Sequence, residues 1–208
     1  MKARFITFEG SEGSGKSTQS KFLYQYLRAR GLKVIYLREP GGTKISEKIR
    51  AILLDAKNDS MLSVCETLLY MAARAQLAAE VIRPALRQGK IVICDRFLDS
   101  TVAYQGYGLG IDIDAIKRMG NFSTQGLKPD LTILLDLPIK EGLKYRKHGK
   151  DRIEKRSFAY HNRVRRGYLN IAARQPRRVK IVKVQADKSM TQGSIREIVN
   201  SFLWYRKV

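Results

Sequence analysis

The feature that most constrains this chain is a glycine-rich loop near its start. Residues 10–17 read GSEGSGKS and fit the pattern G-x-x-x-x-G-K-[ST], which cradles polyphosphates. Such a loop needs a β-strand before it and the first turn of a helix after it, because backbone N–H groups and the helix N-terminus bind the phosphates. The apolar run RFITFEG at 4–10 and the helical spacing within 16–31 provide both. The loop therefore indicates a nucleotide-binding protein and leaves open what receives the terminal phosphoryl group.

Strand-like and helix-like segments alternate along the rest of the chain. Four further apolar runs are predicted to be strands: 33–39, 90–95, 130–138 and 178–185. Three segments are predicted to be helices: 44–54, 64–89 and 191–208. The second of these helices should be bent or interrupted at Pro84.

This alternation predicts an α/β fold of the P-loop three-layer type. Several of the strands are nearly continuous in Val, Ile and Leu, which is typical of a parallel sheet covered by helices on both faces. We expect a five-stranded parallel sheet in a single domain that spans residues 1–208. Ligands should then lie at the carboxyl ends of the strands.

The charge of the chain is unusual. It has 40 Lys and Arg against 19 Asp and Glu, and 13 of the 21 excess positive charges fall within residues 140–183. Nucleic-acid binding is one interpretation of such an excess. Apolar residues are interleaved throughout this stretch, so it is not a detachable basic tail. A site for two phosphorylated substrates also needs positive charge, and part of the excess is accounted for by a solvated surface. We do not expect nucleic acid as a partner, but we keep it as the minor alternative.

Composition predicts a cytoplasmic protein without a membrane span. No run of ~18 apolar residues occurs. The segment at the start of the sequence is too short and too polar to be a signal peptide. Cys65 and Cys94 belong to no cluster with metal-ligand spacing. We interpret both as reduced, mostly structural thiols.

A second strand end should complete the phosphate site. Lys16 would reach the β- and γ-phosphates, and the hydroxyl of Ser17 would be a ligand of Mg²⁺. Asp95, at the end of the strand IVICD, would hold the same ion, although a helix cap or turn residue is the alternative interpretation. Its neighbour Arg96 suits a second phosphate group better than it suits the activation of water. The pair therefore favours transfer to an anionic acceptor over hydrolysis.

Three further stretches point to that acceptor. They are LREPGGT at 37–43, YMAARAQ at 70–76 and DRFLDSTVAYQGYG at 95–108. Together with the glycine loop, PDLTILLDLP and DRIEKRSFAYHNRVRRGYL, they make nearly the whole chain resemble the thymidylate kinase family of P-loop nucleoside monophosphate kinases. The resemblance implies transfer of the γ-phosphoryl group of ATP to dTMP, which gives dTDP and ADP for dTTP synthesis. It also implies Mg²⁺ as cofactor and a homodimer.

The resemblance implies a role for each matching residue. The residues that would bind ATP are Gly10, Ser11, Glu12, Gly13, Ser14, Gly15, Lys16, Ser17 and Thr18. The residues that would bind dTMP are Glu9, Glu39, Pro40, Arg50, Tyr70, Arg74, Arg96, Ser100, Thr101, Tyr104 and Gln105. The catalytic residues would be Lys16, Asp95, Arg96 and Arg152, and the ligands of Mg²⁺ would be Ser17 and Asp95.

Several of these roles concern the acceptor itself. Tyr70 would stack on thymine, Arg74 would hydrogen-bond the base, and Arg50 would contact the acceptor phosphate. Tyr104 would fill the space that a ribose 2′-hydroxyl needs. Taken alone, each has a plainer interpretation: Tyr70 and Tyr104 as packing, Arg50 as a solvated charge, and Arg74 as the partner of an acid such as Glu66.

The chain departs from the family pattern in three places. Tyr70 stands where many members have Phe, and its apolar face should still stack. Gly13 stands where some relatives have Arg in the loop, so a basic lid at about 144–156 should supply that charge instead. This lid is shorter than in close relatives, and Arg152 in DRIE is its most secure match.

Other functions stay open at this point. A kinase for another nucleoside monophosphate would share most of these residues, whereas a deoxynucleoside kinase would not need two arginines at an acceptor phosphate. A nucleic-acid-stimulated ATPase and a nucleotide-binding regulatory module are alternatives from different classes.

Overall fold

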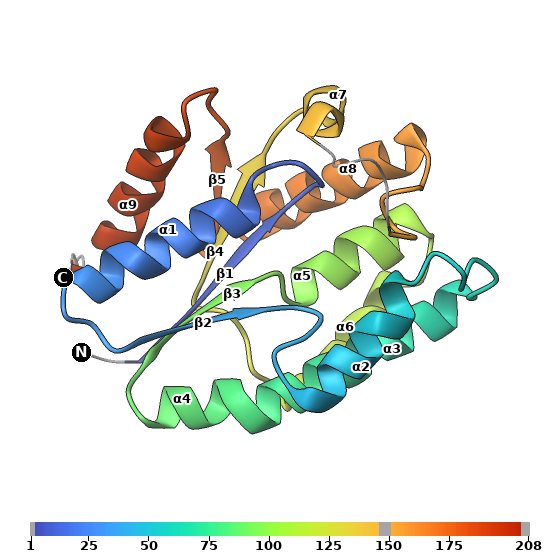
Figure 1. Ribbon diagram of the computed structural model, residues 1–208, viewed down its shortest axis with the longest axis horizontal. Helices are drawn as coiled ribbons and strands as arrows, with labels where there is room; N and C mark the ends of the chain where they lie inside the picture. Colours follow the sequence, from blue (N-terminus) through green and yellow to red (C-terminus); the bar gives the residue numbers. More distant parts are fainter. Residues whose placement is uncertain (1–2, 146–150, 205–208) are drawn as a thin grey trace.

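The computed structural model describes residues 3–145 and 151–204. In these residues one all-parallel sheet has the strand order β2-β3-β1-β4-β5 (Figure 1). The strands are β1 (Arg4–Gly10), β2 (Val34–Arg38), β3 (Ile91–Asp95), β4 (Leu131–Asp136) and β5 (Val179–Lys183). This confirms the predicted five-stranded parallel sheet. In the register of the sheet Asp95 lies beside Phe8 on one side and Arg38 on the other, so the strand ends that carry the predicted site meet at one edge.

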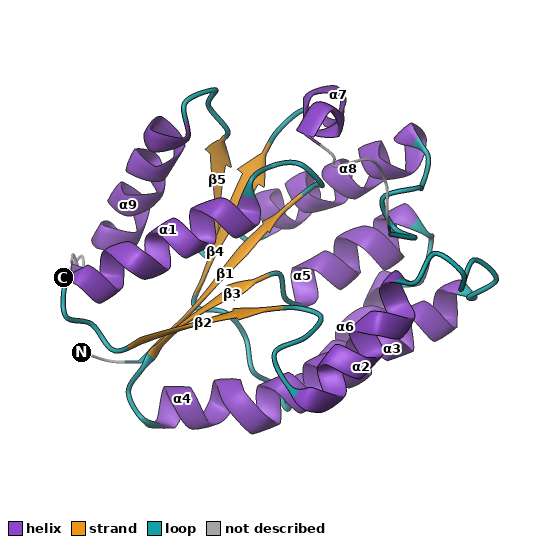
Figure 2. Ribbon diagram, in the orientation of Figure 1, coloured by secondary structure: helices purple, strands orange, loops and turns teal. Residues whose placement is uncertain are grey.

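Helices cover both faces of the sheet, as predicted (Figure 2). One face carries α1 (Lys16–Ala29) and α9 (Lys188–Trp204). The other face carries α4 (Arg83–Arg87), α5 (Leu98–Thr101) and α8 (Phe158–Arg174). The strands are apolar nearly throughout because both of their faces are buried; the five residues of β3 are all buried.

A second group of helices lies beyond the edge of the sheet, where α2, α3 and α6 run side by side (Figure 1). They are α2 (Lys44–Leu54), α3 (Ser63–Leu77) and α6 (Ile113–Thr124). The predicted long helix over 64–89 is present as α3, the π-helical segment η1 (Ala78–Ile82) and α4. The irregular segment directly precedes Pro84, which has no N–H to donate and whose ring crowds the carbonyl four residues earlier. The helices α6 and α8 were not predicted from their spacing.

Two further irregular segments follow strand ends on this side of the sheet. The π-helical η2 (Val102–Gly108) comes after α5, and α7 (Ile139–Gly142) with the 3₁₀ turn η3 (Leu143–Tyr145) comes after β4. Of the lid expected at 144–156, residues 146–150 lie outside the described residues. Residues 151–156 form turns that end where Ser157 caps α8. Within the two described ranges, no helix is long and apolar enough to cross a bilayer.

Candidate active site

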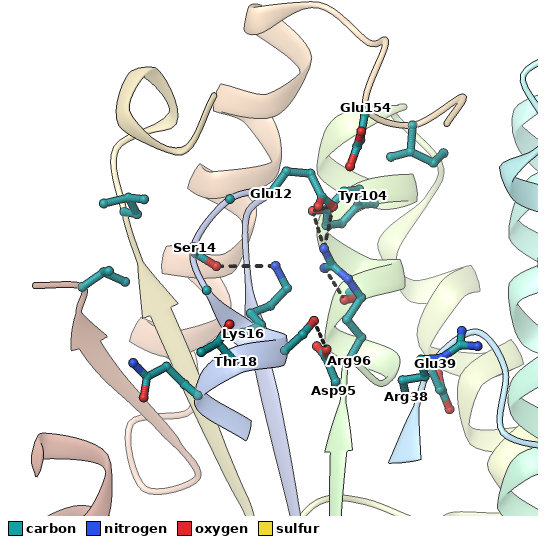
Figure 3. Close-up of a pocket in the computed structure, with 18 of the residues that line it drawn as sticks. Glu12, Ser14, Lys16, Thr18, Arg38, Glu39, Asp95, Arg96, Tyr104 and Glu154 are labelled. Carbon is teal, nitrogen blue, oxygen red and sulfur yellow. Dashed lines mark hydrogen bonds and ion pairs between the residues drawn. The ribbon is translucent and has the colours of Figure 1, made fainter. Parts of the chain in front are cut away.

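The carboxyl ends of the strands open into a cavity of about 810 Å³ (Figure 3). The phosphate loop and the start of α1 form one wall, and we call it the donor wall. The opposite wall combines the segment after β2, the helix α3, the segment after β3 through η2, and residues 151–154. We call it the acceptor wall. A site at this edge of the sheet is where a parallel α/β fold is expected to bind ligands.

The donor wall is built mainly from the backbone of the loop. Gly13 and Gly15 have φ angles of 75° and 82°, in the left-handed region that favours glycine. A Cβ on Gly13 would stand 2.0 Å from the carbonyl oxygen of Gly142, so a larger residue does not fit there without movement of α7. Lys16 Nζ donates to the carbonyl of Ser11 at 2.7 Å. It also donates to Ser14 Oγ at 3.4 Å (Figure 3). The ammonium group thus lies inside the loop that would hold the phosphates.

Lys16 has an unusual proton affinity for a lysine. Burial, together with the charge of Arg96, lowers its pKa from 10.5 to about 8, although Glu12 and Asp95 oppose the shift. The side chain is only 6% exposed. Near neutral pH Lys16 is therefore charged, and it loses that charge at a lower pH than an exposed lysine does.

Ser17 and Asp95 form a pair of oxygen ligands at the bottom of the cavity. Ser17 Oγ donates to Asp95 Oδ2 at 2.5 Å. The other carboxylate oxygen, Oδ1, is buried and has no hydrogen-bond partner among the described residues. Residues 3–145 and 151–204 contain no group of three or more His, Cys, Asp or Glu that could bind a metal by itself. The pair fits Mg²⁺ that takes its remaining ligands from phosphate and water, the usual arrangement for this ion.

Arg96 projects into the cavity from the acceptor wall (Figure 3). Its backbone has a φ of 74°, which is unfavourable for a residue with a Cβ, and the side chain is fixed by five hydrogen bonds. It donates to Glu12 Oε1 at 2.5 Å and to the hydroxyls of Tyr104, Ser100 and Tyr168 at 3.1–3.2 Å. Burial would raise the pKa of Glu12, but the charges of Arg96 and Lys16 outweigh it and lower the pKa to about 2. The guanidinium group is thus held rigidly in the cavity.

Glu9 differs from the prediction because it lies behind the cavity wall. It is 1% exposed and does not line the cavity. Its carboxylate accepts from the backbone N–H of Phe97 at 2.8 Å, from Ser100 Oγ at 2.6 Å and from the hydroxyl of Tyr168 at 2.9 Å. Burial, reinforced by the charge of Asp99, raises its pKa to about 7. The residue supports the segment after β3 and does not itself face the acceptor.

The base side of the acceptor wall contains Tyr70, Thr101 and Gln105, all of which line the cavity as predicted. Thr101 Oγ1 is buried and has no hydrogen-bond partner within the described residues. Gln105 Nε2 donates to Glu66 Oε1 at 2.8 Å. A planar base enclosed here would meet an aromatic side chain and two polar groups.

Arg74 also differs from the prediction. It is 1% exposed, and it is not among the residues that line the cavity. Its Nε donates to Glu39 Oε2 at 2.8 Å and its NH2 donates to the carbonyl of Phe97 at 3.1 Å. Its partner is therefore Glu39 and not Glu66, because the loop after β2 folds back over α3. The remaining nitrogen, NH1, has only a weak acceptor, the sulfur of Met71 at 3.4 Å.

Arg152 is the third difference from the predictions. It lies 8% exposed against α2 and α3 and does not line the cavity, whereas its neighbours Asp151 and Ile153 do. Its NH1 is 2.6 Å from Glu66 Oε2, and its Nε donates to the carbonyl of Leu53 at 3.2 Å. The guanidinium group pairs with the buried carboxylate of Glu66 on α3 and not with the phosphate loop. The position of Arg152 in the sequence gave no sign of this pairing.

Most of the predicted site residues do come together. Besides Arg152, Glu9 and Arg74, the predicted residues that do not line the cavity are Gly10 and Ser11, which lie deeper in the loop. The predicted residues on the cavity wall are Glu12, Gly13, Ser14, Gly15, Lys16, Ser17, Thr18, Glu39, Pro40, Arg50, Tyr70, Asp95, Arg96, Ser100, Thr101, Tyr104 and Gln105.

The structure adds residues that the sequence reasoning missed. One group comes after β5 and lines the donor end of the cavity: Val184, Gln185, Ala186, Lys188 and Thr191. Its position after a predicted parallel strand was a usable signal. Tyr168 on α8, which contacts both Glu9 and Arg96, had no such signal because it lies in a helix that was not predicted.

Comparison with known proteins agrees with this geometry. The thymidylate kinase family model matches residues 8–195. The chain is 53% identical to a thymidylate kinase of Geotalea daltonii over 187 residues, which are 86% of this chain and 87% of that protein. It is 44% identical to a thymidylate kinase of Pelotomaculum thermopropionicum over 211 residues, with 98% and 97% covered. Its fold is similar to the crystal structure of thymidylate kinase from Ehrlichia chaffeensis, with a TM-score of 0.80, 34% identity, and coverage of 96% of this chain and 100% of that one.

Proposed function

Because the chain belongs to the thymidylate kinase family, we propose that its cavity performs the transfer of the γ-phosphoryl group of ATP to dTMP, which gives ADP and dTDP. The observation that carries the proposal is the arrangement of the two walls. Lys16 and the Ser17–Asp95 pair line one side of a single cavity, and Arg96 and Tyr70 line the other. Two phosphorylated ligands bound to these two walls would have their phosphates directed toward each other.

On the donor wall, the loop would bind the phosphates of ATP through its backbone N–H groups and Lys16. The segment after β5 would receive the adenine, since Val184, Gln185 and Ala186 line that end of the cavity. Ser17 and Asp95 would hold Mg²⁺. When bound, this ion neutralises charge on the β- and γ-phosphates and orients them.

On the acceptor wall, Arg96 and Arg50 would bind the phosphate of dTMP. Arg50 lines the cavity, and its NH1 donates to the carbonyl of Pro40 at 2.9 Å, which holds it beside the sugar side. Tyr70 would stack on thymine, and Thr101 and Gln105 would face its edge. Arg74 does not line the cavity, and its pairing with Glu39 supports this wall from behind.

The chemical step needs positioning and charge more than proton transfer. A phosphate monoester has a second pKa near ~6, so the acceptor is largely a dianion at neutral pH and needs no strong base. We therefore assign Lys16 and Arg96 to hold the donor and acceptor phosphates close and in line, and we do not assign Asp95 as a base.

Arg152 can join the reaction only if it moves. Its NH1 shares Glu66 Oε2 with Arg156, whose NH2 is also 2.6 Å away. When Arg152 leaves, Arg156 keeps the buried carboxylate paired, so the movement does not leave an isolated buried charge. We propose that the lid closes in this way and that Arg152 then approaches the transferring group.

We also propose that the protein is a cytoplasmic homodimer and that residues 1–208 act as one unit. Exposed apolar side chains on α2 and α3 support a second copy as partner. Ile52, Val64 and Leu68 are 47%, 60% and 50% exposed. Together with the membership of the family, they make this face the candidate interface, and the mass of the protein in solution tests it.

The test of the proposed function is a coupled assay of ADP release with Mg·ATP. We expect release to require an acceptor and to be fastest with dTMP. The acceptor dUMP lacks one methyl contact, worth about 1–3 kcal/mol, and should be slower. Release without any acceptor, release stimulated by single-stranded DNA, or equal kcat/KM for dTMP and dCMP would each contradict the proposal.

A further inference from the structure

Glu66 is a buried carboxylate that neither touches the cavity nor belongs to the predicted site. It lies on α3, one helical turn before Tyr70, and is 0% exposed. Its Oε2 is 2.6 Å from both Arg152 NH1 and Arg156 NH2. Its Oε1 accepts a hydrogen bond of 2.8 Å from Gln105 Nε2. The guanidinium and amide N–H groups around Glu66 only donate, so both of its carboxylate oxygens act as acceptors.

This contact fixes the orientation of the Gln105 side chain. An amide can present either its NH₂ group or its carbonyl oxygen to a ligand, and the two differ by a simple flip. Here the NH₂ group must face Glu66, because a carboxylate offers no donor for the carbonyl oxygen. Gln105 lines the cavity, and its carbonyl oxygen, which faces away from Glu66, is the acceptor that its side chain can offer to a bound base.

The orientation matters because thymine and cytosine differ at N3. Thymine and uracil carry an N3–H donor, whereas N3 of neutral cytosine is an acceptor. The hydroxyl of Thr101, the other polar group at this wall, can donate or accept and therefore does not discriminate. A carbonyl oxygen fixed toward the base discriminates strongly, because cytosine would bring one acceptor against another in a buried site.

We propose that Glu66 is a positioning residue that holds Gln105 with its carbonyl oxygen toward the acceptor base and so selects a base that donates at N3. The inference rests on the proposed function, since it assumes that the acceptor is a pyrimidine nucleotide bound at this wall. It explains why a charged side chain is buried on α3 at a point where it contacts no substrate.

The test is the ratio of kcat/KM for dTMP to that for dCMP, measured in the parent protein and in Glu66→Gln. The amide of the variant can donate or accept, so Gln105 is free to flip. The ratio should fall on the order of 10-fold. The ratio of dTMP to dUMP should stay within about twofold, because both bases donate at N3. Each ratio is measured on one protein sample, so a partly inactive preparation does not distort it.

Two further variants separate positioning from general support. Arg156→Gln removes a partner of Oε2 and leaves Oε1 on Gln105, so it should leave the dTMP to dCMP ratio unchanged. Gln105→Met removes the amide and should lower the ratio as much as Glu66→Gln does. The double variant Glu66→Gln/Gln105→Met should then be no less selective than Gln105→Met alone.

The outcomes distinguish the two proposals. If the parent protein accepts dCMP as well as dTMP, the proposed function fails. If the parent protein prefers dTMP but Glu66→Gln or Gln105→Met leaves the ratio unchanged, the inference about Glu66 is overturned. It is also overturned if the two ratios fall together, or if Arg156→Gln lowers the dTMP to dCMP ratio as much as Glu66→Gln. If Glu66→Gln does not fold, an unchanged ratio in Gln105→Met still overturns the inference, because Gln105 then does not discriminate between the bases.

Discussion

The two walls of the cavity are held in place by different forces. The donor wall is one continuous loop whose shape depends on glycine backbone and on hydrogen bonds to carbonyl groups, such as that from Lys16 to Ser11. The acceptor wall brings together side chains from distant segments through ion pairs that are largely removed from solvent. Three of these pairs are Arg74–Glu39, Arg152–Glu66 and Arg156–Glu66, and a fourth, Arg96–Glu12, joins this wall to the phosphate loop.

The difference decides what a substitution does. On the donor wall, Lys16 and Asp95 bond to a carbonyl and a hydroxyl, so either can lose its charge without leaving a buried charge unpaired, and catalysis should fall while the fold survives. On the acceptor wall the same change leaves a buried charge without its partner, which costs about 3–5 kcal/mol when the partner was the only one. Stability and activity should therefore separate on the first wall and change together on the second.

The largest expected effect is on the donor side. Asp95→Asn should lower kcat on the order of 10³-fold, because the carboxylate that would hold the metal loses its charge. The amide oxygen can still accept from Ser17, so the melting temperature should stay close to that of the parent protein. Steady-state ADP release and thermal unfolding measure the two quantities.

Asp59→Asn is a matched control, since Asp59 is exposed and lies outside the cavity. It should change neither quantity. A folded Asp95→Asn protein with normal turnover would remove Asp95 from the active site.

The comparison of Arg152 with Arg156 gives a smaller effect. Both contact the same oxygen of Glu66, so either substitution leaves that carboxylate one partner. If Arg152 moves to the transferring phosphoryl group, Arg152→Met should lower kcat on the order of 10²-fold with little change in KM for dTMP. Arg156→Met should lower stability by about 1–3 kcal/mol and should lower kcat less than Arg152→Met does, because Arg152 then leaves Glu66 unpaired whenever it moves.

Chemical denaturation and initial rates in both variants are sufficient for this test. Equal kcat values in Arg152→Met and Arg156→Met would show that Arg152 supports the fold and takes no part in transfer.

The donor wall was also the part that could be predicted from the sequence. Its residues are contiguous, and the pattern at 10–17 with a strand before it and a helix after it specifies their geometry. The parallel sheet could be predicted for a similar reason, since strands buried on both faces are apolar throughout. The segment after β5 could have been predicted as well, because it leaves the carboxyl end of a parallel strand.

The acceptor wall could be predicted only as a set of residues, without their partners. Arg74 was expected to face the base, yet it pairs with Glu39, which is 35 positions earlier. Arg152 was expected to face phosphate, yet it pairs with Glu66, 86 positions earlier. The local sequence around an arginine next to an aromatic or apolar helix face is the same whether that arginine binds a ligand or a buried acid. The choice depends on which carboxylate the tertiary fold brings within reach, and a local pattern does not contain that information.

The smallest predicted effect, a dependence on pH, should appear mainly on the donor wall. Burial, with the charge of Arg96, lowers the pKa of Lys16 to about 8, so this ammonium group is charged at pH 7 and mostly neutral at pH 9. ATP affinity requires the charged form, and the dissociation constant of Mg·ATP should rise about tenfold from pH 7 to pH 9. On the acceptor wall, burial opposes Tyr104 and Glu12, but these two groups raise the pKa of Arg96, which stays charged. The pKa of Glu9 is about 7 and its carboxylate accepts three hydrogen bonds in the ionised form, so dTMP affinity should change by about twofold at most over this range. Calorimetric titration with each nucleotide separately at pH 7, 8 and 9 gives both profiles.

In Glu12→Gln the fall in ATP affinity should begin at a lower pH, because the carboxylate that raises the pKa of Lys16 is gone. A flat ATP profile to pH 9 would mean that Lys16 keeps its proton in the free protein, and parallel losses of ATP and dTMP affinity would place the titrating group outside the donor wall.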